Sequence, residues 1–451
     1  MARVFSEIAL NGGERFLNSA AYKVAGLTTL SHLSKLIIGL LILKQLALVQ
    51  GPQGMGLLGN FMSLVAMATT LAGGGVISGI IKYLAEYNDN PRRQQQFIQS
   101  AFAYVLLFSI LTLMLGYSRL DVITHYVFGD SQYREYMAYF LVAQFFIAFN
   151  NFAFGVANGL GKNKYYAMMI VVGNMVAMVV ASVAIQAYGF TGAVIAIMAP
   201  AVLPFIPALG YCIKARFFNA WQFKQFLQDA NLLSRYSVML FTTAVCFPVV
   251  EIMVRNRILS TIGVDAAGYW QGVTRLSLAY LSFFSLFLSF YLLPLLSAAK
   301  EKSPEIPAAI RQVFLGVCGI FLVMVGVFVC AKDSIIRLAL SKDFLPISHW
   351  MVLQMVGDFF RVLSWIVGIF LIAKARTTLY IMTEIVQGAL FLGLSYGLMA
   401  SYASLEGVMV AYLATYIFYC VAAWGFFVYW YRTKYKRILI PNESDCCSNL
   451  L

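Results

Sequence analysis

Runs of roughly twenty apolar residues recur along the whole chain and alternate with short polar or charged segments. A helix needs about 20 apolar residues to cross the hydrocarbon core of a bilayer. The pattern therefore predicts twelve transmembrane helices, at residues 20–47, 57–84, 97–117, 136–159, 164–187, 190–213, 234–258, 267–297, 309–331, 346–373, 377–400 and 405–431. A further apolar stretch, Leu120–Phe128, is too short to cross and is predicted to lie in a periplasmic loop.

The composition agrees with an all-α polytopic membrane protein. Of the 451 residues, 61% are hydrophobic and 11% are charged, whereas soluble domains are about 45–50% apolar and about 25% charged. The polar opening segment MARVFSEIALNGGERFLNSA lacks the pattern of a cleaved signal peptide, so we expect the first apolar run to direct insertion. The cysteines and histidines stand without metal-ligand spacing, so we expect no metal and no cofactor.

The basic residues predict which side of the membrane each loop faces. A net charge of +13 is compatible with nucleic-acid binding, but in a membrane chain it is more simply the excess of Lys and Arg in cytoplasmic loops. With the N-terminus in the cytoplasm, the cytoplasmic segments hold 21 of the 32 Lys and Arg residues, the opposite side 8 and the spans 3. This bias predicts that both termini are cytoplasmic, and we expect no nucleic-acid partner.

Three pairs of matching positions indicate an internal repeat. Their separations lie between 210 and 215 residues, and the pairs are Gly51 with Gly263, Gln144 with Gln354, and Gly192 with Gly407. A nearly constant offset predicts two six-helix lobes of one orientation, related by a pseudo-two-fold axis along the membrane normal. The predicted divisions are an N-terminal lobe at 1–217, a cytoplasmic linker at 218–233, a C-terminal lobe at 234–431 and a cytoplasmic tail at 432–451.

Basic residues inside the predicted spans are candidates for ligand binding. A charge in hydrocarbon is costly, so it usually faces a partner or a water-filled cavity. Lys35 lies near the middle of the first span, and His32 stands about one turn before it on the same face. Arg275, in the eighth span, has no acidic residue within a helical turn. One deep cation from each lobe would line a cavity that suits a polyanion.

Acidic residues inside the spans are candidates for coupling or gating. Glu251 and Arg255 are spaced i, i+4, and Asp358 and Arg361 are spaced i, i+3, so each pair can neutralise itself on one helix. Glu384, in the eleventh span, has no basic residue within a turn. It is therefore our candidate for a group that couples transport to an ion gradient.

No catalytic site is predicted. The stretch GLGKNK lacks the first glycine and the Ser/Thr of a phosphate-binding loop, and no Ser/His/Asp arrangement is visible. The loops between the spans are too short to hold a glycosyl-transfer site at the membrane surface. We therefore expect a transporter or a scaffold and not an enzyme.

Several stretches together resemble one family of transporters. They are GPQGMGLLGNF at Gly51, GGGVISGIIKYLAEYNDNP at Gly73, YWQGVTRLSLAYLSF at Tyr269, WMVLQMVGDFFRV at Trp350 and IAKARTTLYIMTEIVQ at Ile372. From about Ser31 to the last span the chain is similar to the Wzx-type flippases of the MOP (multidrug/oligosaccharidyl-lipid/polysaccharide) superfamily. Within them it most resembles the branches for enterobacterial common antigen (lipid III) and for O-antigen.

The resemblance implies a function that composition does not show. Such proteins carry an undecaprenyl-diphosphate-linked oligosaccharide from the cytoplasmic to the periplasmic leaflet of a Gram-negative inner membrane. Their two six-helix lobes form a V around a cationic cavity and are thought to alternate access. The pair Ser34-Lys35 looks like the Ser-Arg pair on the first helix of lipid II flippases, which lines their cavity. We expect a functional monomer, with the polysaccharide polymerase and the chain-length regulator as further partners.

The resemblance also orders the candidate residues. We expect substrate to be bound by Lys35, Arg275, Arg361, His32 and Arg255, and coupling or gating to involve Glu384, Asp358 and Glu251. Arg275 stands where the lipid III flippases have a small polar residue, and Leu278 stands where they have Asp. Arg275 is therefore expected to be specific to this branch.

Two other classes of protein remain open. A multidrug antiporter of the same superfamily shares the twelve spans, but it binds organic cations and normally has a carboxylate in its first lobe. The first six predicted spans contain no acidic residue at depth, and Lys35 would repel a cation. A scaffold that holds polysaccharide-assembly enzymes together, without transporting anything, is the third class.

Overall fold

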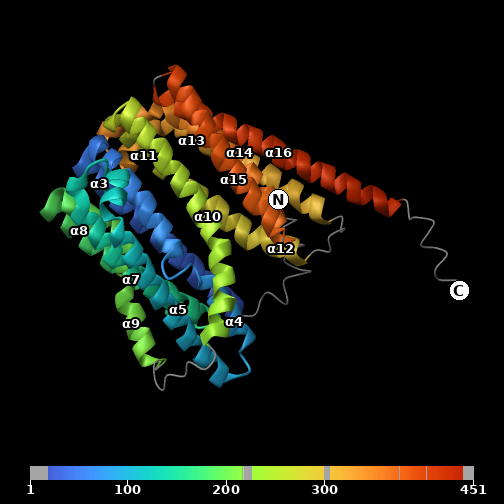
Figure 1. The fold of residues 1–451 in the computed structure, drawn as a ribbon. Coiled ribbons are helices and arrows are strands. Elements are labelled where there is room, and N and C mark those ends of the chain that lie inside the picture. Colours follow the sequence, from blue (N-terminus) through green and yellow to red (C-terminus); the bar gives the residue numbers. More distant parts are fainter. Residues whose placement is uncertain are drawn as a thin grey trace. The chain divides into compact units, whose positions relative to one another are not determined.

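The computed structural model of the protein describes residues 19–215, 217, 226–298, 305–374, 376–402 and 404–439. Every regular element within these residues is a helix, which confirms the predicted all-α class (Figure 1). The α-helices are α3 (Ser19–Leu71), α4 (Ile77–Glu86), α5 (Pro91–Ser118), α6 (Leu120–Phe128), α7 (Arg134–Gly159), α8 (Asn163–Val202), α9 (Phe205–Lys214), α10 (Phe226–Thr261), α11 (Val264–Phe287), α12 (Leu293–Ala298), α13 (Glu305–Ala339), α14 (Ser348–Ala373), α15 (Thr377–Tyr402) and α16 (Leu405–Leu439). Two 3-10 helices, η1 (Ser131–Tyr133) and η3 (Lys342–Ile347), and a π-helical turn, η2 (Leu288–Leu292), complete the elements.

Nine helical stretches of the described residues are long and apolar enough to cross a membrane. Two of them are double length, because predicted neighbouring spans join through a bend. The bend in α3 lies at Gly51, where φ is 60° and Pro52 follows, and the bend in α8 lies at Gly189, where φ is 53°. Only glycine adopts such a φ without strain, so the chain can turn there with no intervening loop. The chain is a multi-pass membrane protein, and the count of twelve crossings stays a prediction.

The stretch Leu120–Phe128 is not the loop that its length predicted. It forms the short helix α6, which ends at Gly129 with a left-handed φ of 78°. Asp121 lies in its first turn and His125 in its last, which suits the helix dipole. Leu120, Thr124 and Val127 are buried at helical spacing, so one face packs inward. The stretch is too short to span a bilayer, yet its apolar period is enough for one buried face.

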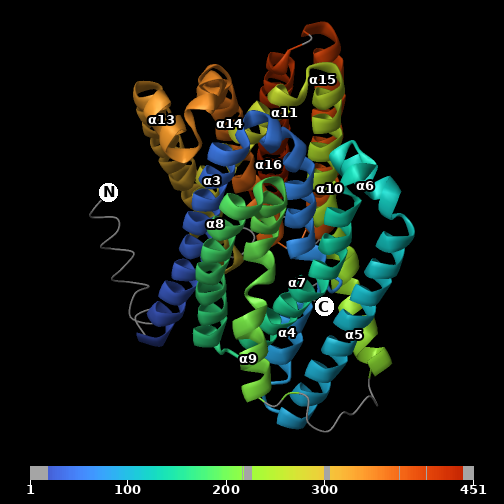
Figure 2. The same cartoon turned by 90° about the vertical axis from the view of Figure 1, so that its left-hand side faces the viewer.

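The backbone divides into two compact units, and the division falls between Ile252 and Met253 inside α10. In the first unit α7 packs against α4, α5, α8 and α9, and α3 runs along α8 (Figure 2). In the second unit α14 packs against α11, α13, α15 and α16. The core of the second unit is apolar and includes Phe284 stacked on Phe321, with ring centroids 5.0 Å apart.

The division lies later in the chain than the predicted linker at 218–233. Of that linker, residues 218–225 lie outside the described residues, as do residues 440–451 of the predicted tail. Residues 226–233 form the first turns of α10, and Asp229 in them is fully buried. Its carboxylate accepts hydrogen bonds from both terminal nitrogens of the Arg93 guanidinium, at 2.5 and 3.1 Å. This two-point ion pair fixes the start of α10 to the start of α5.

The positions paired by the predicted repeat share local structure. Gly51 and Gly263 both have a positive φ, of 60° and 125°. A Cβ on Gly192 would lie 1.8 Å from the carbonyl oxygen of Ala184, and a Cβ on Gly407 would lie 2.9 Å from that of Leu398. Each glycine therefore lets a helix pack its backbone directly on the end of the helix before it.

Candidate functional site

Lys35 lies on the surface of the first unit. Its side chain is exposed, whereas Ser31, one turn before it, is buried and donates to the Leu27 carbonyl at 2.8 Å. Ser34 donates to the Ser31 carbonyl at 2.9 Å, and His32 is half-buried. A Cβ on Gly39, one turn further on, would meet no atom within 4 Å. Lys35 is thus an exposed residue on a helix whose next turn carries no side chain at Gly39.

The predicted pair Glu251 and Arg255 makes contacts in different directions. Glu251 is buried and accepts a hydrogen bond from the Ser63 hydroxyl of α3 at 3.1 Å. Arg255 is fully buried, donates to the Gln271 side-chain oxygen at 2.6 Å and lies over the Trp270 ring, 4.9 Å from its centroid. These contacts show that Arg255 packs α10 against α11. They favour a structural role for Arg255 over the predicted role in binding substrate.

Asp358 is the centre of a polar cluster in the second unit. It is fully buried on α14, and hydroxyl groups from two other helices donate to its carboxylate. Ser277 and Tyr280 of α11 donate to Oδ2, each at 2.5 Å. Tyr412 of α16 donates to Oδ1 at 2.5 Å, and the Gln354 amide lies 3.4 Å from the same oxygen. One carboxylate therefore joins three helices.

Arg361 reaches this cluster through a tyrosine. Its Nη1 donates to the Tyr412 hydroxyl at 3.0 Å, and that hydroxyl donates in turn to Asp358. The guanidinium lies between two rings, with centroids 5.3 Å away at Trp365 and 5.2 Å away at Tyr416. Such cation–π contacts stabilise a charge that water does not reach. The predicted pair of Asp358 and Arg361 is thus linked by Tyr412, which the sequence analysis did not single out.

Glu384 belongs to the same neighbourhood. It is half-buried on α15, it is hydrogen-bonded with Tyr380 one turn earlier, and the charge of Arg361 acts on it. Its cationic neighbour therefore comes from another helix and could not be seen from spacing along α15. Next to it, the Gln387 amide donates to the Tyr416 hydroxyl at 2.7 Å. The structure brings together Asp358, Arg361 and Glu384, three of the predicted residues, in one cluster.

Arg275 lies on α11 and is half-buried.

Sequence reasoning missed the tyrosines of the cluster, although a signal was present. Tyr412 and Tyr416 stand four residues apart on an apolar span, and Ser277 and Tyr280 stand three apart on another, so each pair presents hydroxyls on one helix face.

Comparisons with known proteins fit this geometry. A family model described as "Polysaccharide biosynthesis protein" matches residues 22–300. The lipid III flippases of Escherichia coli (strain K12) and Shigella flexneri are each 31% identical over 407 residues, covering 90% of this chain and 97% of theirs. An inward-facing multidrug resistance MATE family transporter of the MOP superfamily superposes with a TM-score of 0.70 at 14% identity, covering 90% of this chain and 96% of that one. The lipid II flippase MurJ, in an inward closed conformation, gives 0.68 at 16%, covering 88% and 87%.

The fold of the chain is that of transporters of the MOP superfamily. The chain belongs to the polysaccharide biosynthesis protein family, and the two lipid III flippases are its relatives along nearly their whole length. These relatives are transporters and not enzymes.

Proposed function

We propose that this protein is a flippase that moves an oligosaccharide linked to undecaprenyl diphosphate from the cytoplasmic to the periplasmic leaflet of a Gram-negative inner membrane. The observation that carries the proposal is the 31% identity to two proteins named lipid III flippase, over 97% of their length. The exposed Lys35 on α3 supports it, because a diphosphate needs a cation where water is scarce.

The proposal includes an arrangement in the membrane. Twelve helices in two lobes around a cationic cavity, with both termini cytoplasmic, follow from the positive-inside bias and the repeat. Transport proceeds by alternating access of this cavity. The protein works as a monomer, next to the polysaccharide polymerase and the chain-length regulator. Lys35 and Arg275 bind the diphosphate, with His32 beside Lys35, and Glu384 and the Asp358–Tyr412–Arg361 chain act in coupling or gating.

The test is translocation in proteoliposomes. Purified protein is reconstituted with a fluorescent oligosaccharide linked to undecaprenyl diphosphate, and the fraction of label that a membrane-impermeant reagent reaches is followed with time. We expect that fraction to rise with protein and not with empty liposomes. A protein-independent rate would overturn the proposal.

A multidrug antiporter is the second candidate, since a MATE family transporter gives the TM-score of 0.70. That likeness, at 14% identity, concerns the fold. The same proteoliposomes loaded with a fluorescent organic cation separate the two functions. We expect no cation efflux when a proton or sodium gradient is imposed. Gradient-driven efflux without movement of the lipid-linked sugar would establish the antiporter instead.

A further inference from the structure

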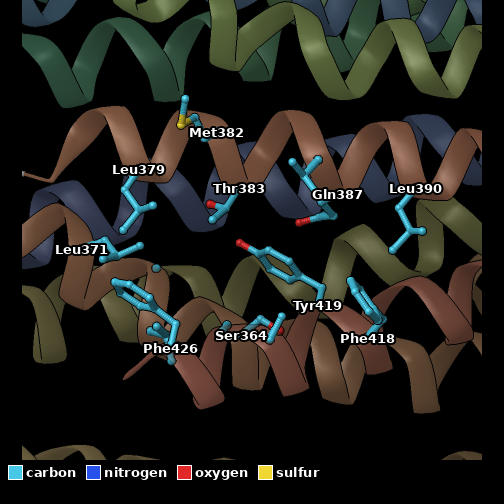
Figure 3. A pocket seen from close by; sticks show the side chains of 15 residues that line it. Ser364, Leu371, Leu379, Met382, Thr383, Gln387, Leu390, Phe418, Tyr419 and Phe426 are labelled. Carbon is cyan, nitrogen blue, oxygen red and sulfur yellow. The ribbon is translucent and has the colours of Figure 1, made fainter. Parts of the chain in front are cut away.

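A groove of about 310 Å³ runs between α14, α15 and α16, within the second unit (Figure 3). Its floor is α14, where Val367, Gly368 and Leu371 lie. In Figure 3 the labelled side chains of α15, among them Leu379 and Leu390, stand along one wall. These two residues are eleven positions apart, which corresponds to roughly 16 Å of helix. The groove is therefore long, narrow and mostly apolar.

The groove is open along one side. The lining residues Met382 and Val386 of α15 are 59% and 58% exposed, and Phe418 of α16 is 60% exposed. Large apolar side chains this exposed stand at the rim of a slot that is not filled by the protein itself. A chain of hydrocarbon could enter sideways without unfolding either helix.

One end of the groove is basic. A second cavity, of about 390 Å³, shares Leu371, Leu379 and Phe426 with the groove and continues from it. Lys374 and Arg376, in the turn between α14 and α15, line this second cavity. Arg376 is exposed, and Lys374 is half-buried and donates to the Leu296 carbonyl of α12 at 2.8 Å. Two cations thus stand where an apolar slot reaches the end of its helices.

We infer that this groove holds the first isoprene units of the lipid-linked substrate as it enters, with the phosphate next to them bound by Lys374 and Arg376 before the diphosphate passes to Lys35 and Arg275; the inference rests on the proposed function. Basic pockets between membrane helices bind lipid phosphates, and arginine suits phosphate because its planar guanidinium can donate two hydrogen bonds at once.

The groove also touches the polar cluster of the second unit. Gln387 lines the groove and donates to the Tyr416 hydroxyl at 2.7 Å, and the Tyr416 ring lies under the Arg361 guanidinium. Thr383 and Tyr419 line it too. A chain seated in the groove is therefore separated from Arg361 by two side chains, those of Gln387 and Tyr416.

The test uses undecaprenyl diphosphate that carries a diazirine in its first isoprene units, added to the purified full-length protein and activated by light. We expect the labelled peptides to come from the groove walls, on α15 near Met382 and on α16 near Phe418. Unlabelled undecaprenyl diphosphate should remove this labelling. Labelling spread evenly over the exposed apolar surface, or phosphatidylglycerol competing as well as the polyprenyl lipid, would overturn the inference.

Two pairs of variants sharpen the result. A Cβ on Gly368 would meet only Tyr380, at 3.6 Å, so Gly368→Leu fills the slot from its floor. Its control is Gly319→Leu on α13, where a Cβ also meets nothing within 4 Å. Gly368→Leu should lower labelling about tenfold, and Gly319→Leu should leave it unchanged. Gly368→Ala, a smaller change, should give an intermediate loss if the larger variant is poorly folded. Labelling that survives both Gly368 variants would contradict the inference.

The second pair concerns the phosphate. Arg376→Glu places an acid at the basic end, and Arg311→Glu makes the same change at an exposed arginine of α13. We expect the first to lower labelling at least fivefold and the second to leave it as it was; equal losses from both would contradict the inference. Failure of the proposed function is a separate result. A wild-type protein that moves the lipid-linked sugar but whose groove is never labelled disproves only the inference, whereas a labelled groove without translocation disproves only the flippase.

Discussion

The two units satisfy their buried polar groups in different ways. In the first unit side-chain amides donate to backbone carbonyls. Asn60 donates to Val127, Gln144 to Ser109, and Asn151 to both Thr69 and Ala72, at 2.8 to 3.1 Å. No bulk water reaches such carbonyls within a membrane; Asn60 and Asn151 hold the ends of α6 and α3 in place, and Gln144 ties α7 to the middle of α5.

In the second unit the contrasting arrangement is a cluster of hydroxyl groups and one half-buried arginine around a single buried carboxylate. Asp358 takes its hydrogen bonds from Ser277, Tyr280 and Tyr412, and Arg361 depends on Tyr412 and two aromatic rings. An amide bonded to a backbone has one arrangement. Hydroxyls around a carboxylate can rotate and exchange partners, so this unit has the chemistry for a switch. We therefore expect the amide contacts of the first unit to be fixed and the Asp358 cluster of the second unit to be adjustable.

The largest effect is expected at Asp358. Asp358→Asn removes the buried negative charge nearest to Arg361 and the acceptor of three hydroxyl groups, and breaking a buried charge arrangement costs about 3–5 kcal/mol of stability. The measurement is the melting temperature of the purified protein in detergent. The double variant Asp358→Asn with Arg361→Gln should recover part of the loss, because the guanidinium then no longer lacks the Asp358 carboxylate. A double variant no more stable than the single one would show that the two residues do not compensate each other.

A smaller loss is expected for the matching change in the first unit. Asn151→Ala removes the donor to two buried carbonyls, at Thr69 and Ala72, and an unsatisfied buried group costs about 1–3 kcal/mol. Asn158→Ala, on the same helix and only half-buried, is the control. The loss should appear in the melting temperature alone, with transport per folded molecule unchanged. An Asn151→Ala protein that keeps its melting temperature but loses transport would show that the adjustable contacts lie in the first unit.

Replacement of Lys35 should weaken substrate transport without changing the stability of the fold. Because its side chain is exposed, Lys35→Ala should leave the melting temperature as it is and lower translocation at least tenfold, a loss of about 1.4 kcal/mol. Lys35→Arg keeps the charge and should retain part of the rate. Lys44→Ala on the same helix serves as the control for loss of a lysine. Full activity of Lys35→Ala would remove this residue from the substrate path.

Replacement of Glu384 should change stability least, and its effect should be confined to the response of transport to an ion gradient. If this carboxylate couples transport to a proton gradient, Glu384→Gln abolishes the response to an imposed gradient while labelling by the polyprenyl probe remains. Glu406→Gln, an exposed acid in the first turn of α16, should respond like the wild type. A Glu384→Gln protein that still accelerates under the gradient would leave polymerisation on the far side as the driving force.

The sequence predicted the class of fold and the charged residues, for a definite reason. A long apolar run, and a charged residue within it, can both be recognised from neighbouring positions in the sequence. A charge in the hydrocarbon of a bilayer costs free energy, so Lys35, Asp358 and Glu384 stood out as candidates. The partners of these residues are not local. Tyr412 is 54 positions from Asp358, and in a chain with 15% aromatic residues its hydroxyl gives no signal of its own. The helix at Leu120–Phe128 was missed because its burial depends on neighbours that only the fold supplies.

The glycines at 192 and 407 have a consequence for ancestry. Each permits a main chain to rest on another main chain, at the Ala184 and Leu398 carbonyls. Such a contact involves no side chain of either partner, so every neighbouring residue can be exchanged over time without disturbing it. When a gene doubles and its halves drift apart, matched residues vanish first where side chains interlock and last where backbones touch. Glycines such as these two, 215 residues apart, are the positions that a duplicated chain would keep longest.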